Sequence, residues 1–245
     1  MKNLILSFVL LFGAAKAQTS NNVNTNGNQN SSDCYTIKMS IKAEGLPAEY
    51  AAFGEIEMVS YNKGEKSKSE TSSMMFSNVV YFDGKLITNL SESMGNKTGY
   101  TATKEEMEGL DKNKAAENKP KIEYVNDKRT IAGYECTKAI VTSIDKDKKE
   151  RQTIVWFTDK LKPLNSNIRR ANRRGMAVDL SDLKGMPLAM ESTMNMQGME
   201  VKSVMIATEV SNKQIDDAVF VPNTEGYTML TFKEFQEKMR SMGGR

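Results

Sequence analysis

The residues best suited to chemistry gather in one short stretch at 183–206, LKGMPLAMESTMNMQGMEVKSVMI. Six of the twenty positions from Met186 to Met205 are methionine, and the whole chain has 17 Met and no His. A thioether is a soft ligand that suits Cu(I). Methionine is also unbranched and polarisable, so it fills cores and lines adaptable apolar sites. Three interpretations are therefore open: a soft-metal site, the lining of a groove, and core packing.

The stretch is typical of a β-hairpin. Gln197-Gly198 lies between two β-compatible segments and suits a two-residue loop, which pairs Met190 with Met205 and Met196 with Met199. Because side chains alternate along a strand, this register divides the residues between two faces. One face is largely polar. The other, which we call the Met face, includes Met190, Met194, Met196, Met199, Val201 and Met205.

The predicted register argues against copper, because the methionines spread along two strands at about 3.3 Å per residue. Only Met194, Met196 and Met199 at the hairpin tip could chelate Cu(I), and no His or nearby Cys assists them. Pure core packing in a strand would favour Val or Ile over Met. We therefore expect a groove for a lipid-like or other apolar ligand, with Trp156 of the strand predicted at 152–158 added to its lining. Core packing and Cu(I) binding remain alternatives.

Enzymatic signatures are sparse in the sequence. The lack of His excludes Ser-His-Asp and Cys-His arrangements and the usual His-containing zinc sites. The sequence has no Gly-rich phosphate loop and no GxSxG motif. We expect a protein that is not an enzyme and uses no cofactor or metal. A basic cluster in NSNIRRANRRG is either a solvated loop or a contact for an anionic head group or an acidic cell-envelope partner; it comprises Arg169, Arg170, Arg173 and Arg174.

The first 17 residues predict a secretory signal peptide. Lys2 precedes an apolar run at 4–12 and a small-x-small cleavage site, Ala15-Lys16-Ala17. The run is shorter than the ~18 apolar residues of a membrane span. We expect cleavage near Ala17-Gln18 and a periplasmic or secreted chain without a membrane span. Loss of Lys2 and Lys16 lowers the formal charge from +3 to +1, which gives no pull toward nucleic acid.

The mature chain is expected to hold one folded domain at 34–245. Residues 18–33 are nearly all Asn, Gln, Ser, Thr and Gly, which predicts a disordered leader. Cys34 and Cys136 are disulfide candidates because the chain is bound for an oxidising compartment. A bond between them would close a loop of about 100 residues. The alternative is two unrelated thiols, one of them packed as a small hydrophobe.

Period-two alternation dominates the domain and predicts antiparallel strands. The clearest example is YTIKMSIKAE at 35–44, and Asp83-Gly84 predicts a hairpin turn between two β-rich runs. A charged helix is expected at 103–116 and a second at 231–241, where Thr231 and Glu234 fit a capping box. The fold class is mainly β (α+β), as a sandwich or a strongly curved sheet. Further strands are expected at 54–62, 66–76, 122–125, 129–144 and 152–158.

A longer run of motifs resembles a known family. Residues 129–163 contain Ile-x-Gly-Tyr-x-Cys-x-Lys-Ala and then Thr-x-Val-Trp-Phe-Thr-Asp, and LKGMPLAME, ATEV and FVPNTEGYTML follow. This order resembles the exported Bacteroidota family called domain of unknown function 4412, well over 120–230 and loosely over 34–119. It is also similar to the GLPGLI family, whose motif is replaced here by Gly185-Met186-Pro187-Leu188.

Both families resemble distant members of the LolA-type lipoprotein-carrier superfamily. That resemblance implies a curved, incomplete antiparallel barrel, with helices lying across a concave face that binds acyl chains. The segments 103–116 and 231–241 would be the covering helices, and the Met face would line the groove or the helix-covered side. Lipoprotein carriers hold their lid with a particular arginine that matches no single arginine of this chain. The resemblance therefore implies a lipid-like or apolar ligand but not lipoprotein transport.

Overall fold

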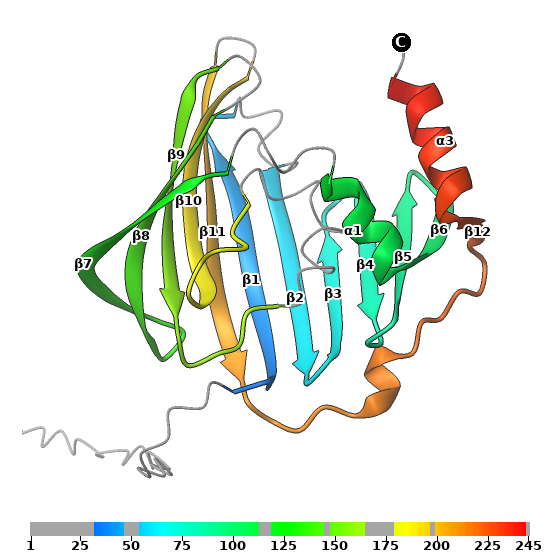
Figure 1. Cartoon of the computed structure of the whole chain (residues 1–245), viewed down its shortest axis with the longest axis horizontal. Helices are drawn as coiled ribbons and strands as arrows, with labels where there is room; N and C mark the ends of the chain where they lie inside the picture. Colours follow the sequence, from blue (N-terminus) through cyan, green and yellow to red (C-terminus); the bar gives the residue numbers. More distant parts are fainter. Residues whose placement is uncertain are drawn as a thin grey trace, which may run out of the picture.

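The fold was analysed in a computed structural model that describes residues 32–46, 54–112, 119–144, 148–164, 179–196 and 199–243. Its strands form one sheet in the order β12-β6-β5-β4-β3-β2-β1-β11-β10-β9-β8-β7. β12 runs parallel to β6, and every other neighbouring pair is antiparallel. Figure 1 shows that the sheet curves strongly without closing, so β12 and β7 are its edges. The predicted mainly-β class with a curved, incomplete antiparallel barrel is confirmed.

The strands follow the alternation of the sequence. Their bounds are β1 (Cys34–Glu44), β2 (Glu55–Lys63), β3 (Lys66–Ser72), β4 (Phe76–Phe82), β5 (Leu86–Ser93), β6 (Asn96–Thr103), β7 (Lys121–Ile131), β8 (Tyr134–Ile144), β9 (Glu150–Thr158), β10 (Met186–Met196), β11 (Met199–Ser211) and β12 (Thr228–Thr231). The predicted turn at Asp83-Gly84 is confirmed between β4 and β5. There the Asp83 carboxylate accepts hydrogen bonds from the backbone amides of Lys85 and Leu86, both at 2.8 Å.

Charge is strictly divided between the two faces of β1–β6. The ladders that join these six strands run without a register shift, so one parity rule describes them all. Odd-numbered residues of β1, β3 and β5 share a face with even-numbered residues of β2, β4 and β6. Every residue at these positions is uncharged, and all Lys and Glu side chains of the six strands lie on the opposite face. We call the uncharged side the covered face.

Two helices pack against the β4–β6 end of the covered face. α1 (Lys104–Lys112) lies across the curve of the sheet in Figure 1, and its Met107 is buried in a cluster with Val80, Phe82 and Ile87. α3 (Phe232–Gly243) adds Phe232 and Phe235, whose rings lie 5.6 and 4.2 Å from the Tyr100 ring. Both predicted helices therefore exist and dock on the sheet.

Both helices begin with a capping box. The predicted box of α3 is confirmed, because the Thr231 amide donates to Glu234 at 2.8 Å and the Glu234 amide donates to the Thr231 hydroxyl at 3.3 Å. Thr103 and Glu106 make the same reciprocal pair at α1, at 2.7 and 3.2 Å. Each box satisfies amides that a helix start leaves without partners. In both cases the strand ends at the threonine of the capping box and the helix begins at the next residue.

A long connection at 212–227 links β11 to β12. Figure 1 shows it running along one end of the sheet, with the short helix η2 (Asp217–Phe220) on its path. Asp217 forms ion pairs with Lys63 at 3.0 Å and Lys66 at 3.3 Å, at the turn between β2 and β3. The connection therefore lets β12 reach the far edge and pair with β6.

Several expectations differ from the structure. The strand predicted at 129–144 is two strands, because Ala132 (φ 47°) and Gly133 (φ 85°) form a turn between β7 and β8. β6 and β12 were not predicted. Ser32 and Asp33, assigned to the leader, make backbone hydrogen bonds with Lys160, Lys162 and Gly64. The predicted signal peptide at 1–17, the leader up to residue 31 and the arginine cluster at 169–174 lie outside the described residues.

The turn between β5 and β6 yields a stability prediction. Ser93 pairs with Asn96 across Met94 (φ 49°) and Gly95 (φ 78°), a two-residue loop with both central φ angles positive. Such a loop favours Asn-Gly, and Met94 is 77% exposed, so its side chain contributes little packing. Met94→Asn should raise the free energy of unfolding by about 0.5–1 kcal/mol, measured by urea denaturation. Gly95→Ala is the opposite control and should lower it; equal effects of both changes would contradict this account.

Candidate functional site

The predicted methionine hairpin is confirmed in its register. β10 pairs with β11 so that Met190 faces Met205, Met194 faces Val201, and Met196 faces Met199. The loop at 197–198 lies outside the described residues. Because directly opposite residues share a face, the Met face exists as one side of this two-stranded ladder.

The residues of the Met face have different surroundings. Val201 and Met205 are 2% and 5% exposed, so the face is buried at both positions. Met190 is half-buried and packs between two apolar clusters, one around Met205 and one around Val155. The side chains of Met194, Met196 and Met199 lie outside what the structure describes. The part of the Met face that the structure shows therefore lies within packed side chains.

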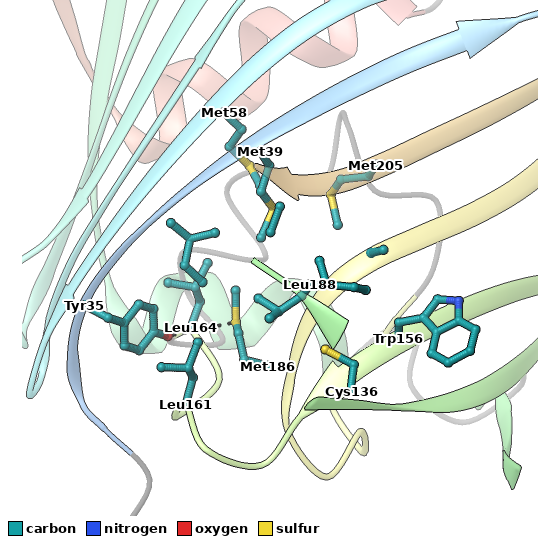
Figure 2. Close-up of a cluster of buried hydrophobic side chains, with 14 residues drawn as sticks. Tyr35, Met39, Met58, Cys136, Trp156, Leu161, Leu164, Met186, Leu188 and Met205 are labelled. Carbon is teal, nitrogen blue, oxygen red and sulfur yellow. Dashed lines mark hydrogen bonds between the residues drawn. The ribbon is translucent and has the colours of Figure 1, made fainter. Parts of the chain in front are cut away.

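An apolar pocket begins at Met205 and continues onto β1 and β2. Figure 2 shows Met39, Met58 and Met205 on one side of a buried cluster, with Met186 and Leu164 across from them. Met39 pairs with Met58 on the covered face, and β11 follows β1 in the sheet, so the sheet itself brings the three thioethers together. The pocket is lined by Met39, Met58, Pro163, Leu164, Leu180, Met186, Pro187 and Met205.

Hydrogen bonds link the segment 159–164 to the residues at the beginning of β1. The Ser32 amide donates to the Lys160 carbonyl at 2.8 Å, and the Lys162 amide donates to the Ser32 carbonyl at 2.9 Å. The buried Tyr35 hydroxyl also donates to the Lys162 carbonyl. These bonds position 159–164, which supplies Pro163 and Leu164 to the pocket. The cover is thus held by backbone hydrogen bonds at one end and by apolar side chains over the methionines.

The pocket is almost closed. Its volume is about 20 Å³, which is room for roughly one water molecule, whereas small-molecule sites span roughly 300–1,000 Å³. Four of its eight lining residues are methionines, and methionine has the flexibility to repack when its surroundings change. A ligand larger than water can therefore enter only if Leu164, Leu180 and their neighbours move away from the sheet.

Only part of the predicted ligand-binding set reaches this pocket. Met205 lines it, whereas Met190 and Val201 do not. Trp156 pairs with Ala189, and Met190 pairs with Val155, so the Trp156 ring lies on the face opposite Met190. It lies apart from the pocket methionines in Figure 2, between Arg129 and Lys138 at 5.5 and 5.7 Å from its centroid. The alternation of β9 therefore keeps Trp156 out of the pocket lining, although the ring belongs to the same buried cluster as Met205.

Sequence reasoning missed most of the pocket. Met39 and Met58 belong to strands predicted from the other end of the chain, and β1 lies beside β11 only in the folded sheet. Met186 lay in the methionine stretch but outside the predicted Met face. The alternation around Met39 marked it as buried, and no local signal linked it to Met205.

The two cysteines are free thiols, so the candidate disulfide is not formed. Cys136 is fully buried in the same apolar cluster as Met205. The Cys34 sulfur lies 3.9 Å from the Lys213 carbonyl, at the start of β1. Burial raises the pKa of the Cys136 thiol from 9.0 to about 11. Cys136 therefore behaves as the small buried hydrophobe of the alternative interpretation.

A second hollow lies at the tips of two adjacent hairpins. It has a volume of about 450 Å³ and lies beside Met74 and Met94, which are 73% and 77% exposed. Phe76 pairs with Ser93, which places the β3–β4 and β5–β6 turns side by side. No pattern in the sequence predicts this hollow. It is open and shallow, and its lining mixes methionine with serine and Glu92.

The described residues hold neither a cluster of metal-ligating side chains nor a membrane-spanning helix. No group of three or more His, Cys, Asp or Glu side chains there is arranged to hold a metal ion. None of the helices in the described part of the chain is long and apolar enough to cross a membrane.

The thiols provide a direct test of the packing around the pocket. With a thiol-reactive reagent at pH 8, we expect the native protein to react quickly once, at Cys34, and a second time only on unfolding. Cys34→Ala should remove the fast reaction and Cys136→Ala the slow one. If neither sulfur reacted with the reagent until the protein had been reduced, the two cysteines would form a disulfide, which would contradict the structure.

Cys136 also predicts a pH dependence. Its folded pKa of about 11 exceeds its ordinary 9.0, so the folded protein holds this proton more tightly than the unfolded chain does. The contribution of the thiol is fully present below pH 9 and is lost as the pH rises toward 11. Stability measured by urea denaturation should therefore fall more steeply from pH 9 to 11 in the wild type than in Cys136→Ala. Parallel pH profiles would contradict the assignment.

Comparison with known proteins gives a fold-level similarity only. No protein-family model matches the chain, and no curated protein matches it. PNGF-II overlaps 84% of this chain and 32% of its own at 14% identity and a TM-score of 0.43, so this chain spans less than half of that protein. The MucA/MucB complex of Pseudomonas aeruginosa overlaps 78% and 56% at 11% identity (TM-score 0.36). Lipoprotein LppX of Mycobacterium tuberculosis overlaps 74% and 88% at 8% identity (TM-score 0.33).

These similarities are distant. All three identities lie below 25% and all three TM-scores below 0.5. They leave the predicted membership of the domain of unknown function 4412 family, and of the LolA-type superfamily, as a prediction.

Proposed function

We propose that this chain is a non-enzymatic binding protein for a lipid-like or other apolar ligand, held between the sheet at β1, β2, β10 and β11 and the loop segments 159–164 and 179–185. The observation that supports it most is the pocket itself. Its lining residues in the described part of the chain are all apolar, half of them methionine, and it lies where two loop segments rest on the sheet. An apolar ligand gains free energy in proportion to the apolar area it buries, about 25 cal/mol per Å².

The closed pocket represents the ligand-free state in this proposal. Leu164 and Leu180, both 4% exposed, occupy the space that the ligand would take. They come from loops rather than from the sheet, and loops can move without breaking a strand ladder. Met39, Met58 and Met205 stay on the sheet and adapt their side chains to the ligand. In binding, contacts between the ligand and the methionines therefore replace the contacts that Leu164 and Leu180 make in the closed pocket.

Export, family membership and a cell-envelope partner, which the sequence predicts, complete the proposed function. The predicted export places the protein in the periplasm or outside the cell, where apolar molecules need a soluble carrier. Membership of the exported family of domain of unknown function 4412, as a distant LolA-type relative, is consistent with that role. Met190 and the hairpin-tip methionines would extend the lining once the cover has opened, and a cell-envelope partner would receive or deliver the ligand.

A matched pair of leucines tests the proposal. Leu164 lines the pocket, whereas Leu161 belongs to the same segment and the same cluster, is 1% exposed, and does not line it. Leu→Ala at either position should cost about 2–5 kcal/mol of stability. Only Leu164→Ala enlarges the pocket, so it should bind the fluorescent apolar probe N-phenyl-1-naphthylamine at least fivefold more tightly than the wild type. Leu161→Ala should stay within twofold of the wild type.

Lipid extraction and native mass spectrometry of protein purified from its own host complete this test. Bound lipid or another apolar molecule, released by organic solvent, is the expected result. The proposal would be rejected if the host protein were consistently empty and if neither the wild type nor Leu164→Ala bound the probe.

A further inference from the structure

The covered face has a polar centre between two apolar ends. One row of cross-strand partners runs from Ile37 through Ser60, Ser69, Val80 and Asn89 to Tyr100. Ser60 and Ser69 face each other on β2 and β3 and are fully buried. Small hydroxyl side chains thus occupy the middle of a face whose β1 and β4–β6 ends are packed with aliphatic and aromatic residues.

The two hydroxyls of this pair lack hydrogen-bond partners. Neither the Ser60 nor the Ser69 oxygen has a partner among the described residues. Leaving a buried polar group without a partner costs roughly 1–3 kcal/mol. Alanine at both positions would avoid that cost while keeping nearly the same volume. Within the described part of the chain, folding therefore gains no hydrogen bond from serine at either position.

The neighbouring row shows how the same face satisfies its polar groups elsewhere. Asn62 pairs with Ser67 one row away, and both are buried. The Ser67 hydroxyl donates to the Asn62 side-chain oxygen at 2.9 Å, and the Asn62 amide donates to the Asp33 carbonyl at 2.9 Å. Ser67 is thus a partnered serine only two residues from the unpartnered Ser69.

The unpartnered pair lies next to the pocket methionines. Ser60 follows Met58 by two residues on the same face of β2, a step of about 7 Å along the strand. Met58 pairs with Met39, and both line the pocket. A molecule with its apolar part among these methionines would place atoms about five or six carbons further along its chain, roughly 7 Å away, against the two serine hydroxyls. The hydroxyls would then complete an apolar site with a polar end.

The charge pattern restricts the polar group that fits there. No position of the covered face in β1–β6 carries a charge, so no side chain on that face can neutralise a carboxylate or a phosphate. Burying a charge without a partner is far more costly than burying a hydroxyl or an ester. A serine hydroxyl both donates and accepts, so the pair can bind a hydroxyl, an ester or an amide.

We propose that Ser60 and Ser69 form the subsite for the uncharged polar group of an amphipathic ligand whose apolar chain enters the methionine pocket. This inference rests on the proposed function and names its ligand class: neutral lipids with a hydroxyl or ester head, rather than free hydrocarbons or anionic lipids. The serines supply hydrogen bonds, and the absence of charge on the face discriminates against anionic heads.

Two probes with the same acyl chain test the subsite. 1-Monooleoylglycerol carries a neutral hydroxyl and ester head, and oleate carries a carboxylate. Their affinities are measured at pH 8 by displacement of N-phenyl-1-naphthylamine, with circular dichroism to confirm folding. The wild type should prefer monooleoylglycerol at least tenfold. Ser60→Ala/Ser69→Ala should lose about tenfold in affinity for monooleoylglycerol, as expected for two neutral hydrogen bonds, and should bind the apolar probe within twofold of the wild type.

Ser67→Ala is the matched control on the same strand. It should leave both affinities within twofold but lower the melting temperature, because it leaves the buried side-chain oxygen of Asn62 without its hydrogen-bond donor. Ser60→Ala/Ser69→Ala should keep or raise the melting temperature. An equal loss of melting temperature in both variants would mean that water satisfies the pair in the free protein, which overturns the subsite.

The remaining outcomes separate the subsite from the function beneath it. Unchanged affinity for monooleoylglycerol in Ser60→Ala/Ser69→Ala, with probe binding intact, overturns the subsite and leaves the proposed function standing. Failure of the wild type to bind the apolar probe or either lipid overturns the proposed function itself.

Discussion

All charged side chains of β1 to β6 lie on one face of the sheet. The opposite, covered face therefore has to be shielded from water by other parts of the chain. Its strands carry apolar and small polar residues that have to be covered, because each exposed apolar area weakens the folded state. The positions of the two helices and of the segment 159–164 follow from this requirement. α1 and α3 cover the β4–β6 end with Met107 and Phe232, and 159–164 covers the β1 end with Leu161 and Leu164.

The two ends are covered in different ways, and the difference bears on function. At the β4–β6 end, helices begin from strand termini through capping boxes, and aromatic rings pack directly on Tyr100. At the β1 end, the cover is a loop segment held by a few backbone hydrogen bonds to Ser32 and by leucine packed on methionine. A loop can leave the sheet with far less loss of structure than a docked helix. The methionine pocket thus lies under the more easily displaced cover.

The centre of the covered face gives the pocket its chemical character. Apolar packing would be tightest if Ser60 and Ser69 were aliphatic, and folding would be easiest if their hydroxyls had partners, yet neither holds. The contrast with Ser67, whose hydroxyl is bonded within the same sheet, shows that the surroundings allow partnered serines. A neutral amphipathic ligand accounts for the polar centre and the apolar pocket together, since its head and chain require both.

The amino-acid sequence alone determined the features that depend on neighbours in the chain. Period-two alternation predicted β1, the Asp83-Gly84 turn fixed the β4–β5 hairpin, and the Gln197-Gly198 loop predicted the pairing of Met190 with Met205. The Thr231–Glu234 capping box predicted the start of α3. Each is a local rule: one residue sets the backbone of the next few, or a short turn sets a register. The turn at Ala132-Gly133 was missed because alternation continues on both sides of it.

Only the tertiary structure decided which residues meet. Met39 and Met205 are far apart in the chain, and they line one pocket because β1 pairs with β11 in the folded sheet. The same assembly moved Trp156 to the opposite face, kept Cys34 from bonding with Cys136, and placed Ser60 opposite Ser69. The order of the strands and the packing of the loop 159–164 on the sheet depend on how much surface many distant residues bury together. That quantity cannot be predicted from any short segment of the sequence.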